Sequence, residues 1–131
     1  MKIQNRQITE NFKLFEFLYG AALPPEAKEL NKKHITEEVI ANIEKIAVVA
    51  QQIRNHVGKP MTITCGFRCL EWEKMRKRSG TSRHVVGDAI DFKFAAKADM
   101  DQAFEFLRDH NGGLSRYPTF IHVDLGRKRR W

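Results

Sequence analysis

The amino-acid sequence predicts a single mixed domain in which helices alternate with short strands, in either the α/β or the α+β class. A chain of 131 residues has the length of one domain. Its hydrophobic fraction of 42% is sufficient for a packed core and argues against disorder. Segments with apolar residues at helical spacing alternate along the chain with segments in which apolar and polar residues alternate.

The first half of the chain contains the strongest helical pattern. Residues 11–19 are rich in aromatic side chains and predict a short helix, and the prolines at 24–25 predict a break, because proline cannot sit inside a helix. Thr36 predicts the N-cap of a long helix that ends at Gly58. Its apolar side chains recur at helical spacing: Val39, Ile40, Ile43, Ile46, Ala47, Ala50, Ile53 and Val57. We expect it to be the main core helix.

The second half alternates strands and helices. We expect strands at residues 61–67, 88–94 and 119–125, and helices at residues 69–78 and 98–110. The last two strands each combine an apolar face with a polar face, because neighbouring side chains along a strand point to opposite sides.

These polar faces carry side chains that can bind a metal. Asp91 lies on the polar face of the second strand, His122 and Asp124 lie on that of the last strand, and His84 precedes the second strand. If the two strands are neighbours, His84, Asp91 and His122 converge. Two imidazoles and one carboxylate are a usual ligand set for catalytic zinc that leaves a position for water. The alternative is a solvated sheet face with surface histidines.

The basic composition favours an anionic partner. Lys and Arg total 23 against 16 Asp and Glu, which gives a net charge of +7. Nucleic acid, an anionic lipid surface or an anionic cell-wall polymer would each fit, and a solvated face would also explain the basic runs at residues 74–83 and 127–130. No helix-turn-helix, zinc-finger or RNA-binding signature is present, so we do not expect specific nucleic-acid binding.

Membrane and redox signals are weak. The longest apolar run, residues 46–50, is far shorter than the roughly 20 residues that span a bilayer. The N-terminal segment lacks the features of a signal peptide, so we expect synthesis in the cytoplasm. Cys65 and Cys69 are spaced neither as a zinc ribbon nor as a redox motif, and we expect both thiols to be reduced.

One motif makes a family resemblance specific. The pattern Ser82-x-His84-x-x-Gly87-x-Ala89-x-Asp91 resembles the signature of the zinc D-alanyl-D-alanine peptidases, whose superfamily includes lysostaphin-type enzymes and the hedgehog signalling domain. The segments NFKLFEF, ITCGFRC and RYPTFIHVDLGRKRRW also resemble segments of the short bacterial and phage D-alanyl-D-alanine carboxypeptidase-like proteins. The resemblance covers nearly the whole chain. It implies one domain over residues 1–131, with an α+β fold: a small antiparallel sheet flanked by helices, and a zinc site on its exposed face.

The resemblance also implies roles for individual residues. The family's zinc ligands fall on His84, Asp91 and His122. Arg68 would contact a carboxylate or carbonyl oxygen of the substrate and stabilise charge there. Ser82 would orient the site through a hydrogen bond, although a plain turn residue is an equal alternative.

The last strand departs from the family pattern. Many relatives have His-x-His there, or an acidic base three residues before the ligand, whereas this chain has His122-Val123-Asp124 and Thr119 at the place of the acid. In one assignment His122 binds zinc and Asp124 is the general base. In the other, Asp124 is the third ligand and His122 is the base. We favour the first, because histidine is the commoner zinc ligand.

The function implied is that of a zinc metallopeptidase acting on peptidoglycan stem peptides, as a D,D-carboxypeptidase or an endopeptidase. We expect a monomer that acts on the cell wall without a membrane partner, in the manner of a phage or prophage lysis enzyme. A non-catalytic zinc-binding or wall-binding module of the same fold is one alternative. A basic nucleic-acid-binding domain is another.

Overall fold

A computed structural model describes residues 2–131. The helices are α1 (Leu14–Leu18), α2 (Pro25–Lys33), α3 (Glu37–Val57), α4 (Leu70–Met75) and α5 (Lys97–Phe106), with a 3-10 turn, η1 (Arg83–Val85). The strands are β1 (Gln7–Thr9), β2 (Phe12–Lys13), β3 (Thr62–Cys65), β4 (Ala89–Lys93), β5 (Gly113–Arg116), β6 (Ile121–Asp124) and β7 (Arg129–Arg130).

The main sheet has five strands in the order β3-β4-β6-β5-β7. The first three pairings in this order are antiparallel, and only the short β7 pairs parallel to β5. The predicted α+β class with a small antiparallel sheet is therefore confirmed, and the α/β alternative is excluded. The register of β4 against β6 places Asp91 opposite His122 and Ala89 opposite Asp124.

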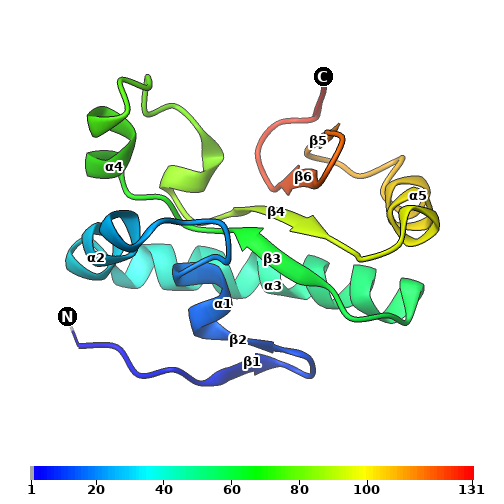
Figure 1. Ribbon diagram of the computed structural model, residues 1–131, viewed down its shortest axis with the longest axis horizontal. Helices are drawn as coiled ribbons and strands as arrows, with labels where there is room; N and C mark the ends of the chain where they lie inside the picture. Colours follow the sequence, from blue (N-terminus) through cyan, green and yellow to red (C-terminus); the bar gives the residue numbers. More distant parts are fainter. Residues whose placement is uncertain (1) are drawn as a thin grey trace.

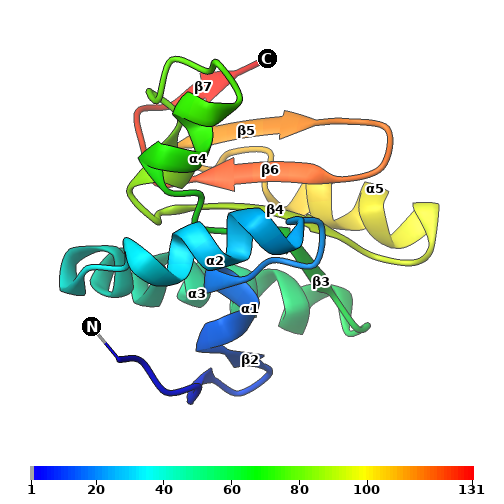
Figure 2. The same cartoon turned by 60° about the vertical axis from the view of Figure 1, so that its left-hand side comes forward.

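Helix α3 lies against one face of the sheet. Strands β6 and β5 and the C-terminal segment lie beyond β4, away from α3 (Figure 1, Figure 2). The buried side chains of α3 pack with the apolar residues of β4 and β6 in one core that includes Ile90, Phe92, Ile121 and Val123. Thr36 caps α3 by accepting a hydrogen bond from the backbone N–H of Val39, and Gly58 ends it with a left-handed φ of 72°. Both ends of this helix are as the sequence predicts.

A glycine positions the loop before β4 against α3. Gly87 has a φ of 89°, and a Cβ atom there would lie 2.9 Å from the carbonyl oxygen of Val39. Only glycine allows this backbone conformation together with so close an approach. Because the loop is fixed on α3, the histidine three residues before Gly87 is directed toward the sheet.

Several elements differ from the prediction. The prolines do not only break the chain, because Pro24 is the N-cap and Pro25 the first residue of α2, where a missing N–H costs no hydrogen bond. The helix at 69–78 spans only Leu70–Met75, and the helix at 98–110 spans Lys97–Phe106. The hairpin β1–β2 and strands β5 and β7 were not predicted, because segments of two to four residues show no clear period.

Candidate metal centre and substrate groove

Three predicted ligands converge at the centre of the sheet. Nδ1 of His122 lies 2.9 Å from Oδ1 of Asp91, and Nε2 of His84 lies 3.2 Å from the same oxygen. The three residues retain 2–9% of their exposure. The polar face that we expected to be exposed is therefore largely covered, because η1 and the C-terminal segment close over it.

His84 is held in one orientation from two sides. Its Nδ1 lies 2.6 Å from the carbonyl oxygen of Gly66, and its backbone N–H donates to Oγ of Ser82 at 3.2 Å. A carbonyl oxygen only accepts hydrogen bonds, so Nδ1 carries the proton and Nε2 is directed toward Asp91. Ser82 thus caps η1 and holds the backbone of His84.

His122 is held in the complementary way. Its Nε2 lies 2.7 Å from Oδ2 of Asp124, which leaves Nδ1 facing Asp91. Asp124 is completely buried. Its Oδ1 accepts from the backbone N–H groups of Gly113 (3.0 Å) and Gly126 (2.9 Å), and its Oδ2 accepts from Arg129 at 2.6 Å. Both oxygens of this carboxylate are therefore saturated with donors.

The residue types of His84, Asp91 and His122 suit a zinc ion. Each imidazole has one nitrogen engaged by an oxygen acceptor, so the second nitrogen of each ring faces Oδ1 of Asp91. Zinc bonds of about 2.0 Å in a tetrahedron place neighbouring ligand atoms about 3.3 Å apart. The observed separations of 2.9 and 3.2 Å are close to this.

The cluster also favours positive charge. Burial alone lowers the pKa of the His84 imidazole, but Cys65 and Asp91 outweigh it and raise that pKa to about 10. Burial likewise opposes the effect of Asp124 and Asp91 on His122, whose pKa is raised. The pKa values of Asp91 and Asp124 are lowered, because histidine hydrogen bonds outweigh burial. A cation between these side chains would take the place of the protons.

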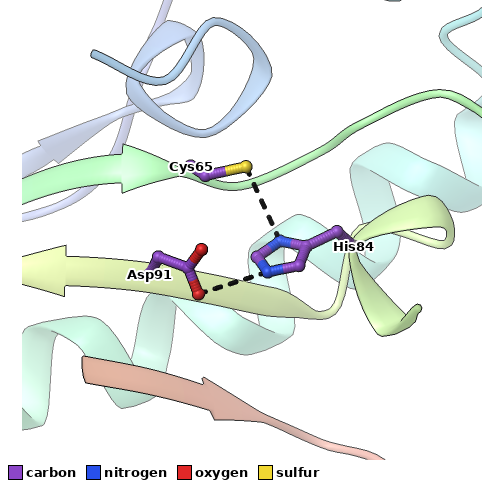
Figure 3. A group of neighbouring side chains, drawn as sticks. All are labelled: Cys65, His84 and Asp91. Atoms are coloured by element: carbon purple, nitrogen blue, oxygen red, sulfur yellow. Dashed lines mark hydrogen bonds and ion pairs between the residues drawn. The ribbon is translucent and has the colours of Figure 1, made fainter. Parts of the chain in front are cut away.

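Cys65 lies beside the cluster, although no pattern in the sequence predicts a role for it there. The thiol of Cys65 lies 3.9 Å from Nδ1 of His84, and Cys65, His84 and Asp91 form a group that could hold a metal ion (Figure 3). The pairing of β3 with β4 places Cys65 opposite Asp91. This pairing, rather than the C-x3-C spacing, is the relevant signal. Both cysteines are free and buried.

Arg68 is fixed next to the cluster by a buried acid. Its Nε lies 3.4 Å from Oε1 of Glu73, whose side chain is 1% exposed, and its Nη2 lies 3.4 Å from Oγ of Ser82. The Arg68 side chain as a whole remains 15% exposed. Glu73 was not identified from the sequence, where it is one charge among several in a basic helix.

Two hollows meet at the cluster. One, of about 390 Å³, is lined in part by Arg68 and Asp91. The other, of about 690 Å³, is lined in part by His122 and Trp131. Because Asp91 and His122 are 2.9 Å apart, each hollow reaches the cluster at one of these two side chains.

The basic run at residues 127–130 is partly committed to the fold. Arg129 binds Asp124, and Arg130 donates to the carbonyl oxygens of Gly112 (2.7 Å) and His110 (2.5 Å). These contacts hold the C-terminal segment beside β5. Part of the run therefore stabilises the fold, which weakens its interpretation as a nucleic-acid contact.

Comparisons with known proteins show the family of the chain. Residues 23–124 match the family model described as Peptidase M15. The chain belongs to this peptidase family. Its resemblance to the zinc D-alanyl-D-alanine carboxypeptidase-like peptidases is thereby confirmed at the level of the family.

One curated relative is similar over part of the chain. Over 78 residues the chain is 40% identical to the probable peptidoglycan L,D-endopeptidase MepK of Haemophilus influenzae. The match covers 53% of this chain and 41% of the relative, so less than half of that protein is represented here. Among the helices of residues 2–131, none combines the length and the apolar character needed to cross a membrane.

Proposed function

We propose that this M15-family peptidase is a zinc metallopeptidase that hydrolyses peptide bonds in peptidoglycan stem peptides. The observation that carries the proposal is the convergence of His84 Nε2 and His122 Nδ1 on one oxygen of Asp91. The family membership and the peptidoglycan endopeptidase named among its relatives support the reaction and the substrate.

In this proposal His84, Asp91 and His122 hold the zinc ion. The bound ion would supply Lewis acidity, which activates a water molecule and polarises the scissile carbonyl. The hydrogen bonds to Gly66 and Asp124 hold one nitrogen of each imidazole and direct the other toward Asp91, where it would bind the ion after losing its proton. The site is thereby organised before substrate arrives.

Arg68 would stabilise the oxygen on which negative charge develops. Glu73 and Ser82 hold its guanidinium in place, so little reorganisation is needed when the charge appears. Ser82 would act through Arg68 and through the backbone of His84.

We propose a positioning role for Asp124. Its role as general base remains a prediction, and its surroundings weigh against it, because four donors already occupy the two oxygens of a completely buried carboxylate. A general base must reach the attacking water directly or through one water. The alternative in which Asp124 is the third ligand is disfavoured by the same contacts, because Nδ1 of His122 is the atom that faces Asp91.

Endopeptidase activity fits the groove better than carboxypeptidase activity. A carboxypeptidase needs space for only one or two residues beyond the scissile bond, whereas here a hollow lies on each side of the cluster. Stem peptide could therefore extend in both directions. The cell wall would be the place of action of a monomeric enzyme, and release in the manner of a phage lysis protein remains a prediction.

The experiment combines metal analysis with digestion of peptidoglycan. We expect about one zinc per chain, and release of peptide fragments from purified peptidoglycan that stops with a chelator and returns with zinc. His84→Ala and Asp91→Ala should lose both properties, whereas His56→Ala, at a histidine stacked on Phe106 outside the site, should keep both.

The other outcomes discriminate between the alternatives. Zinc binding without hydrolysis of any muropeptide would indicate a non-catalytic module. A protein that binds no zinc even when zinc is supplied would contradict the proposal.

A further inference from the structure

The larger hollow beside the cluster has a strongly basic lining. Its residues are Thr81, Ser82, Arg83, His122, Asp124, Arg127, Arg129 and Trp131. Three guanidinium groups thus surround a space that adjoins a proposed metal ligand. A guanidinium in this lining that has no acidic partner in the chain would attract an anionic group on the ligand.

The three arginines differ in what they contact. Arg83 forms a two-point ion pair with Asp88, in which Nε donates to Oδ1 at 3.0 Å. Arg129 binds Asp124 at 2.6 Å, and its guanidinium lies 4.8 Å from the ring centroid of Trp131. Arg127 is exposed and forms no ion pair with any residue in 2–131. The hollow therefore contains one uncompensated guanidinium.

Trp131 forms a fixed apolar wall beside this charge. Its indole N–H donates to the hydroxyl of Tyr117 at 2.7 Å, and its carbonyl oxygen accepts from Ser115 at 2.6 Å. The side chain nevertheless remains 54% exposed. A rigid, exposed aromatic ring next to a free arginine can hold the backbone of a peptide whose carboxylate pairs with the arginine.

We propose that this hollow is a specificity subsite that binds a free carboxylate of the stem peptide on one side of the scissile bond, with Arg127 as its binding residue. The inference rests on the proposed function and narrows its substrate to peptides that are not amidated at this position. Guanidinium pairs with carboxylate through two parallel hydrogen bonds, whereas a carboxamide offers no charge and only one acceptor oxygen.

The test compares peptides that differ only in one group. The probes are stem tetrapeptides with D-isoglutamate or D-isoglutamine, and a second pair with free or amidated diaminopimelate. Binding to the zinc-loaded protein is measured by calorimetry, and hydrolysis of the cross-linked forms is measured by chromatography. The variants are Arg127→Gln and Lys128→Gln, the second being a neighbouring exposed lysine that does not line the hollow.

The wild-type protein should bind the acid of at least one pair about 10-fold or more tightly than its amide, the scale of a charge-assisted hydrogen bond. Arg127→Gln should lose this preference through weaker binding of the acid, and Lys128→Gln should retain it. Equal affinity for acid and amide in both pairs overturns the proposal, as does a preference that survives in Arg127→Gln.

Failure of the two proposals can be told apart. Preferential binding of the acid without hydrolysis of any peptide would leave the subsite standing and contradict the peptidase function. Hydrolysis of the acid and amide peptides at equal rates, with equal affinities, would support the peptidase function and contradict the proposed subsite.

Discussion

Asp124 holds His122 from the side of the ring opposite Asp91. Its Oδ2 lies 2.7 Å from Nε2 of His122, while Nδ1 of the same ring lies 2.9 Å from Asp91. One imidazole thus connects a fully buried carboxylate to the proposed metal position. Contacts of this kind fix the tautomer of a ligand and raise its basicity.

Replacement of Asp124 by asparagine should weaken zinc binding by about 10–100-fold, because the amide cannot draw the proton to Nε2 as a carboxylate does. Competition with a chromogenic chelator measures the affinity. Asp109→Asn, at an exposed position, is the control. Unchanged affinity in Asp124→Asn would show that the contact does not organise the ligand.

Gly113→Ala should disturb the same carboxylate from its other side. A Cβ atom there would lie 2.7 Å from Cγ of Asp124 and 2.7 Å from Nη2 of Arg129. We expect a loss of about 1–3 kcal/mol in the free energy of unfolding, from overpacking, together with weaker zinc binding. Denaturant titration and chelator competition measure the two effects.

Gly58→Ala is the matched control for that variant. Gly58 has a φ of 72° but nothing within 4 Å of its missing Cβ, so alanine strains the backbone without reaching the site. It should lower stability by about 1 kcal/mol and leave zinc affinity unchanged. An equal loss of zinc in both variants would attribute the effect of Gly113→Ala to stability alone.

Arg68→Gln should lower kcat by about 10²–10³-fold with little change in zinc content, because the guanidinium would contact developing charge rather than the metal. Glu73→Gln should lower kcat less, since it loosens the arginine without removing it. Steady-state kinetics on a cross-linked muropeptide and metal analysis separate these effects. Loss of zinc from Arg68→Gln would place the arginine in the metal site instead.

Stability should depend on pH in opposite ways with and without zinc. In the metal-free protein the pKa of His84 is raised from 6.5 to about 10, so the stabilisation from its protonated form is complete below 6.5 and is lost as the pH rises toward 10. Zinc needs the unprotonated imidazoles, so its contribution grows over the same range. The difference in Tm between zinc-loaded and chelator-treated protein should therefore increase with pH, and parallel Tm curves would contradict this.

Much of the fold follows from local patterns in the sequence. Thr36, Gly58 and the apolar spacing between them are sufficient to predict α3. Alternation predicts β4 and β6 and their apolar faces, whereas the polar faces that it predicts to be exposed are buried as well. Strand β5 and the two-residue β7 escape prediction because their structure comes from pairing with β6 and β5 rather than from their own composition.

The sequence was sufficient to predict the side chains that would bind the metal, but not the residues that hold those side chains in place. Asp91 and His122 stand out because they lie on the polar faces of alternating strands, His84 because it lies just before the first of these strands, and all three because they fall in segments that resemble a family. Glu73 and Cys65 do not stand out, because their importance depends on neighbours 5 to 26 positions away along the chain.

The sequence by itself determined the class of the protein, the central helix, the faces of the two late strands and the residues that can bind a metal, since these depend on residue type and local period. Only the tertiary structure decided that Asp91 lies opposite His122, that Asp124 is buried among four donors, and that two hollows adjoin the cluster. Strand order and register arise from packing between segments distant in the chain. The conformational preference of a residue does not say which distant segment it will pack against, so these features appear only when the whole core is assembled.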